Sequence, residues 1–104
     1  METPKINLSD FSKQFAVNIV KMCSTPSAKK NELFALMLHR GVQVGEQVCL
    51  RQMQDALTAA KAARYYLELL NDSGLAAGGQ LASLLADAET LIKIMYVIVH
   101  PKQK

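Results

Sequence analysis

Residues 28–71 constrain the fold most strongly, and they read AKKNELFALMLHRGVQVGEQVCLRQMQDALTAAKAARYYLELLN. It contains no proline and no strong turn signal, and its only glycines are Gly41 and Gly45. One helix of this length would reach ~65 Å at about 1.5 Å per residue, which is too long for a compact domain of this size. The chain must therefore reverse direction inside this stretch. We place the reversal at residues 49–54, with residues 41–45 as the second choice.

Apolar residues keep one helical phase across the two glycines. They fall within one half of a helical wheel, and they are Leu33, Phe34, Met37, Leu38, Val44, Val48 and Cys49. A turn at the glycines would reset this phase, so we expect Gly41 and Gly45 to lie inside one helix. Each glycine costs about 1 kcal/mol relative to alanine in a helix interior. Their spacing, within the apolar half of the wheel, would let a second helix pack closely there.

Three further stripes of apolar residues have helical spacing. Asn7 or Ser9 can cap the first helix, and Ser27, after the break at Pro26, can cap the second. Gly74 is expected to end the third helix in a left-handed conformation. The four expected helices span residues 8–23, 28–49, 53–71 and 80–99. Helices joined by short connections pack antiparallel, so residues 1–104 predict a single all-α domain, an antiparallel up-down four-helix bundle.

The composition is that of an ordinary globular chain. Hydrophobic residues make up 50% of the 104 residues and charged residues 20%, a balance that excludes a disordered chain. No apolar run approaches the ~20 residues of a membrane-spanning helix, and residues 1–7 lack the apolar core of a secretory signal. Cys23 and Cys49 cannot make a disulfide framework, so they are expected to be small core residues in a reducing compartment. We therefore expect a soluble cytoplasmic protein that has no membrane partner.

No group of residues in the sequence predicts catalysis. His39 and His100 have no cysteine or carboxylate at a metal-binding spacing. Asp87 and Glu89 are two positions apart, so on a helix they point about 200° apart and cannot form a paired-carboxylate site. Glu89 instead has the spacing of a modest ion pair with Lys93. We expect no enzyme activity, no metal and no cofactor.

The net charge of +3 comes entirely from the first half of the chain. Residues 1–52 hold seven basic and four acidic residues, whereas residues 53–104 hold five of each. A basic surface on the first two helices would attract a phosphate backbone, especially if self-association repeated it. The residues predicted to contact RNA or DNA are Lys13, Lys21, Lys29, Lys30, Arg40 and Arg51. An ordinary solvated surface remains the favoured alternative, because no aromatic residues interleave with these cations as a stacking platform would require.

Three of the expected helices carry a second group of apolar residues away from the core stripe. Scattered surface hydrophobes are ordinary, but repeated second patches are typical of subunit contacts. We therefore favour self-association. The residues predicted to lie in the interface are Val17, Val20, Tyr65, Leu69, Ile94 and Val97.

Four strings in the sequence resemble one bacterial family of four-helix-bundle proteins, first noticed as products of intervening sequences in large-subunit ribosomal RNA genes. Residues 15–21, FAVNIVK, resemble the opening of the family. Residues 39–47, HRGVQVGEQ, resemble its Arg-Ser-Gly-Thr-Ser-Ile-Gly-Ala-Asn motif and keep both glycines and the aliphatic residue between them. Residues 65–70, YYLELL, and 88–95, AETLIKIM, are similar to its Tyr-Trp-Leu-x-Leu-Leu and Glu-Leu-Ile-Lys-Ile-Leu strings.

The chain also departs from the family pattern. Ala59 and Ala62 stand where the family usually carries glutamates, and Gln47 and Leu50 replace an asparagine and a glutamate. The link between the second and third helices is shorter than in the family.

The resemblance implies a homo-oligomer, commonly a pentameric ring, with no established catalytic activity. A relative, the accessory variability protein of diversity-generating retroelements, binds a reverse transcriptase and nucleic acid through a basic surface. We therefore expect a non-enzymatic, self-associating structural or adaptor module, with RNA or DNA as a candidate ligand. The alternative is a module whose extra apolar patches dock a different protein, such as a reverse transcriptase.

Overall fold

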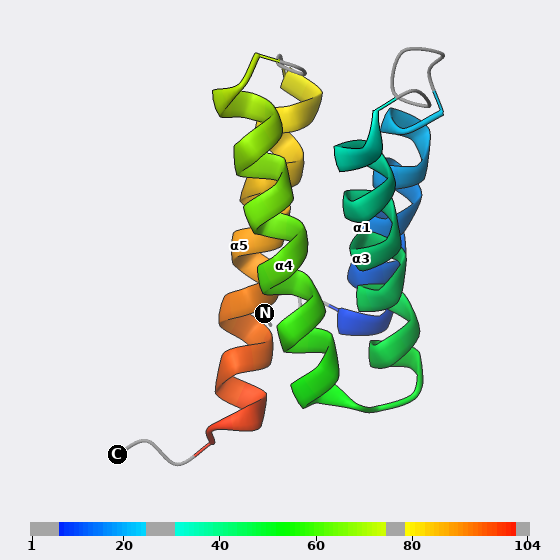
Figure 1. Ribbon diagram of the computed structural model, residues 1–104. Helices are drawn as coiled ribbons and strands as arrows, with labels where there is room; N and C mark the ends of the chain where they lie inside the picture. Colours follow the sequence, from blue (N-terminus) through cyan, green and yellow to red (C-terminus); the bar gives the residue numbers. More distant parts are fainter. Residues whose placement is uncertain (1–6, 25–30, 75–78, 102–104) are drawn as a thin grey trace, which may run out of the picture.

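The computed structural model describes residues 7–24, 31–74 and 79–101 (Figure 1). These ranges contain four helices and no strands, so the all-α prediction is confirmed. The helices are α1 (Leu8–Met22), α3 (Glu32–Cys49), α4 (Met53–Asp72) and α5 (Gly79–Val99).

Asparagine side chains begin the first two helices. Asn7 has an extended backbone, and its Oδ1 accepts a hydrogen bond from the Asp10 amide at 3.1 Å. Asn31 caps α3 in the same way, since its Oδ1 accepts from the Leu33 amide at 2.8 Å. Each bond satisfies an amide that has no partner inside the helix. The helix therefore begins at Glu32 and not at residue 28 as predicted, and the expected cap Ser27 lies outside the described residues.

The chain reverses between α3 and α4 at residues 50–52, inside the segment predicted for the reversal. Arg51 adopts a left-handed backbone with φ of 62°. The Arg51 amide donates to the Val48 carbonyl and the Gln52 amide donates to the Gln47 carbonyl, both at 2.9 Å. This pair of bonds is the Schellman motif, in which the left-handed position is usually glycine. Arginine stands there instead, which is why the turn has no signal in the sequence.

One hydrophobic core receives side chains from all four helices. Its largest fully buried apolar residues are Phe15, Ile19, Met37, Val44, Leu57, Leu67, Leu70, Leu81, Leu84, Leu91 and Met95. On α4, four buried alanines lie among them, which brings the backbone of α4 close to its neighbours. As predicted, α3 continues through both of its glycines, and Gly74 has a left-handed backbone with φ of 76°.

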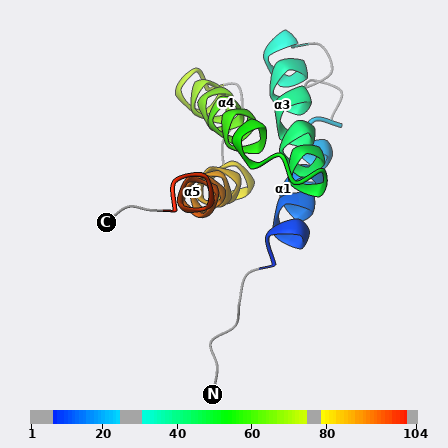
Figure 2. The ribbon, with the colours of Figure 1, turned by 90° about the horizontal axis from the view of Figure 1, so that it is seen from below.

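Each helix packs on the next one along the chain. Helix α1 contacts α3, α3 contacts α4, and α4 contacts α5, whereas α1 and α5 touch over a smaller surface. Seen from below in Figure 2, α3 and α5 lie at opposite corners of the group. Within the described residues, no helix combines the length and apolarity needed to cross a bilayer.

Candidate functional site

The described basic residues from the predicted set lie on α1, on α3 or in the link that follows α3. Lys13 and Lys21 are exposed on α1, and Arg51 is exposed in the link. Arg40 is half-buried on α3, where its Nη1 donates to Gln43 Oε1 at 3.0 Å. Lys29 and Lys30 lie outside the described residues.

The structure spreads these cations along the α1–α3 side and does not gather them into one patch. Lys21 lies in the last turn of α1, whereas Arg51 lies in the α3–α4 link, at the other end of the molecule in Figure 1. Lys13 lines a groove between α1 and α3 that also contains the carboxylates of Asp10 and Glu46. The groove is therefore not a strongly basic site by itself.

All six residues of the predicted interface retain solvent exposure. Val20, Tyr65 and Val97 are the most exposed, at 46%, 57% and 64%, and the other three are half-buried. Further exposed large apolar residues lie outside the predicted interface, and they are Leu36, Val42, Leu50, Tyr96 and Ile98.

A run of exposed apolar residues lies at the end of α5. Tyr96, Val97 and Ile98 are consecutive and all exposed, and Ile94 is half-buried one turn earlier. A helix that is apolar around most of its circumference is normally covered on all sides. Consecutive apolar residues on a helix point 100° apart, so the run Tyr96-Val97-Ile98 already carries this signal in the sequence.

A second apolar surface forms a shallow hollow on the outer side of α3. Ala35, Leu38 and Val42 line it together with three polar side chains. The polar residues of the hollow are His39, Gln43 and Glu46. The helical wheel places Leu38 with the core stripe, but the side chain is only half-buried and it also borders the hollow.

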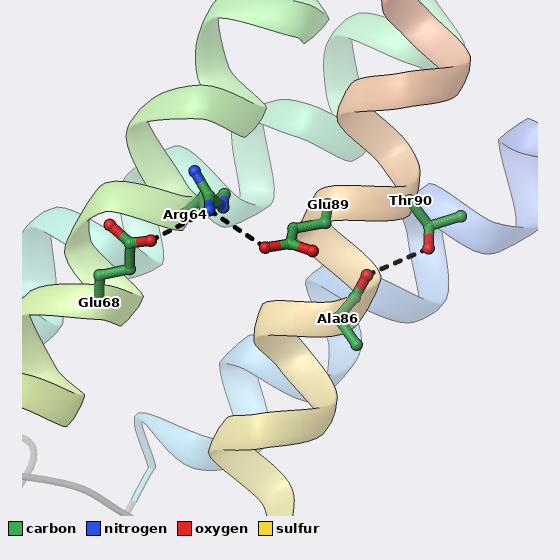
Figure 3. Close-up of polar contacts among 5 residues, drawn as sticks. All are labelled: Arg64, Glu68, Ala86, Glu89 and Thr90. Carbon is green, nitrogen blue, oxygen red and sulfur yellow. Dashed lines mark hydrogen bonds and ion pairs between the residues drawn. The ribbon is translucent and has the colours of Figure 1, made fainter.

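An ion-pair cluster connects α4 to α5 on the surface (Figure 3). Arg64 Nη2 lies 3.1 Å from Oε2 of Glu68 and 3.1 Å from Oε2 of Glu89. The predicted partner of Glu89 was Lys93, and that prediction is wrong, because the arginine reaches across from the neighbouring helix. The arginine side chain is 38% exposed, so each pair contributes at most about 1 kcal/mol.

Metal-ligand spacing and shifted pKa values describe the remaining titratable side chains of the described residues. No group of three or more His, Cys, Asp or Glu residues within them could hold a metal ion. Burial raises the pKa of the Cys23 thiol to about 11, which keeps the thiol protonated, and its Sγ donates to the Phe34 carbonyl at 3.6 Å. The predicted core position is correct for this cysteine and wrong for Cys49, which is exposed at the end of α3. Burial also raises the pKa of the Asp87 carboxyl.

Comparison with known proteins adds information on the fold. No protein-family model and no curated protein matches the chain. Among solved structures, the chain is similar to the crystal structure of a protein with unknown function from the S23 ribosomal protein family of Bacteroides thetaiotaomicron. The match has 23% sequence identity and a TM-score of 0.79, and it covers 88% of this chain and 97% of the other. At this identity the similarity shows a shared helical fold.

Proposed function

We propose that this protein is a non-enzymatic, self-associating module built as an antiparallel up-down four-helix bundle, with a structural or adaptor role. The observation that carries the proposal is the exposed apolar surface at the end of α5, where Tyr96, Val97 and Ile98 are 48%, 64% and 46% exposed. Contiguous apolar surface of this kind is typical of protein interfaces. We further propose membership of the family of ribosomal RNA intervening-sequence proteins, which the similarity to an S23-family structure supports. A cytoplasmic location suits its two unpaired cysteines.

Light scattering of the purified chain tests self-association directly. The wild-type chain is expected to have a mass several times that of the 11.4 kDa monomer, and a pentamer is expected from the family resemblance. The Val97→Glu variant would bury a charge in the interface and should dissociate at concentrations where the wild type stays associated. Ser83→Glu adds the same charge at an exposed polar position of the same helix and should associate normally. A wild-type chain that stays monomeric at high concentration would contradict the proposal.

We propose RNA or DNA binding as a second function, supported by the position of the predicted cations. Each described member of the set is at least partly exposed, and all lie on α1, α3 or the adjoining link. Self-association would repeat this side of the molecule and so raise the local concentration of positive charge.

The test of this second function is the binding of labelled single-stranded and double-stranded RNA and DNA at increasing salt. The affinity should fall linearly with salt on a double-logarithmic plot. Binding should weaken when the charges of Lys29 and Lys30 are reversed together, and also when the charge of Lys13 is reversed. Lys61→Glu on α4 is the matched control and should bind like the wild type. Absence of binding at low salt, or binding that does not respond to salt, would exclude the proposal.

The alternative function is docking of a different protein on the same apolar surfaces. The exposed residues of α5 would suit such a partner equally well. This alternative predicts a monomeric chain that gains stability only when a partner such as a reverse transcriptase is added. The light-scattering experiment therefore distinguishes the two.

A further inference from the structure

The apolar hollow on α3 has a regular construction. Ala35, Leu38 and Val42 are spaced three and four residues apart, so they form one stripe on the outer side of the helix. Val42 is 43% exposed although it is aliphatic. Glu46 lies one turn beyond Val42 on the same stripe, lines the same hollow, and is exposed.

The apolar surface on α5 is a ridge of exposed and half-buried side chains on one helix. Ile94 lies three residues before Val97 and four residues before Ile98, so its side chain neighbours both of them on the surface of the helix. Lys93 lies one turn before Val97 and is exposed. The hollow thus has the Glu46 carboxylate one turn from Val42. The ridge has the Lys93 ammonium group one turn from Val97.

A single copy of the chain cannot cover these two surfaces with each other. Helices α3 and α5 lie at opposite corners of the molecule (Figure 2). The residues of both surfaces are exposed or half-buried. A two-fold contact of either surface with itself offers no pairing between Lys93 and Glu46, because the first residue borders the ridge and the second lines the hollow. A contact between the two different surfaces, one from each copy, buries both and pairs opposite charges.

We propose that the α5 ridge of one copy docks into the α3 hollow of a second copy of this chain. The inference rests on the self-association proposed above and assigns the surfaces that make it. The register follows from the charges. Lys93 and Val97 are four residues apart, which is about 6 Å along α5, and Val42 and Glu46 are equally far apart along α3. On α5 the charged residue precedes the valine in the chain, whereas on α3 it follows the valine. The two helices therefore pack antiparallel, with Lys93 opposite Glu46 and Val97 opposite Val42.

Two single variants and their mixture test this contact. Val97→Glu damages the ridge and leaves the hollow intact, whereas Val42→Glu damages the hollow and leaves the ridge intact. Each alone should weaken self-association at least about tenfold, because docking would bury an unpaired carboxylate. An equimolar mixture should form a one-to-one dimer, since one intact ridge and one intact hollow remain. Sedimentation of the two variants with different fluorescent labels measures the pairing, and circular dichroism verifies that each variant is folded.

Charge exchange tests the register independently. Lys93→Glu and Glu46→Lys should each weaken association, and the double variant should recover it, because the pair is restored with opposite polarity. Ser83→Glu is the matched control for an added charge on α5.

The outcomes separate this inference from the self-association on which it rests. If the wild type associates but the two valine variants do not pair, or if Val42→Glu associates like the wild type, the assignment of surfaces is wrong and self-association stands. If the wild type is monomeric, both are wrong, and a partner of different sequence covers the two surfaces.

Discussion

Gly41 and Gly45 lie one turn apart on α3, yet their surroundings differ. A Cβ atom at Gly41 would overlap the side chain of Ile19, which is fully buried on α1. A Cβ atom at Gly45 would lie 3.5 Å from the Ser12 carbonyl oxygen and 3.6 Å from the Ala16 Cβ, which is ordinary van der Waals contact. The two positions therefore respond differently to the same substitution.

Gly41→Ala should destabilise the protein by about 1 kcal/mol or more, because overpacking outweighs the gain in helix propensity. Gly45→Ala should stabilise it by up to about 1 kcal/mol, because only the propensity gain remains. Urea denaturation measures both changes. Ile19→Val removes the nearest methyl group. It should lower the free energy of unfolding less in the Gly41→Ala background than in the wild type. Strictly additive effects would contradict the overlap between these two residues.

The Cys23 thiol links stability to alkaline pH. Burial raises its pKa from 9.0 to about 11 in the folded chain. Between these values the unfolded chain loses the thiol proton and the folded chain keeps it, so the free energy of unfolding falls as pH rises. The contribution is fully present below pH 9 and is lost towards pH 11. Urea denaturation at pH 9 and at pH 11 measures this change. The free energy of unfolding should fall less between these values for Cys23→Ala than for the wild type. Cys49→Ala, at an exposed position, should keep the wild-type pH dependence.

At the scale of elements, the end of α3 depends on one unfavourable backbone conformation. Arg51 occupies the left-handed position of the Schellman motif with φ of 62°. Side chains with a Cβ pay about 1–2 kcal/mol there, whereas glycine does not, although glycine loses more entropy on folding. Arg51→Gly should therefore stabilise the protein by about 0.5–1 kcal/mol in thermal or chemical denaturation. Arg51→Ala removes the same charge without relieving the backbone, and an equal gain in that variant would refute the explanation.

The helices can be predicted because apolar periodicity is a property of the local sequence. The reversal can be predicted because the length of the segment is known from the sequence as well. The apolar phase across Gly41 and Gly45 predicts one helix, and the length of residues 28–71 requires a reversal near residue 50. The start of α3 was misplaced because Ser27 and Asn31 are both acceptable caps, and only the backbone of Asn31 decides between them.

The candidate surfaces were predictable only in part. A helical wheel identifies Val20, Tyr65 and Val97 as lying off the core stripe, and all three are exposed. It cannot identify a pair such as Arg64 and Glu89, because their contact depends on how α4 and α5 pack. For the same reason the sequence does not indicate that helices α3 and α5 lie at opposite corners of the molecule.

At the scale of the whole molecule, stability should depend on protein concentration. The α3 hollow and the α5 ridge exist only in the folded chain, so a contact between copies favours the folded state by mass action. The Tm of the wild type should rise by roughly 3–6 °C for each tenfold increase in concentration. Calorimetry over a hundredfold concentration range would measure this, with Val97→Glu as a variant whose Tm should stay nearly constant. The Tm of Ser83→Glu should rise with concentration as that of the wild type does, because the added charge lies outside the ridge. If the wild-type Tm does not change with concentration, contacts between copies do not stabilise the folded chain. The α3 hollow and the α5 ridge would then remain exposed in a monomer that is stable on its own.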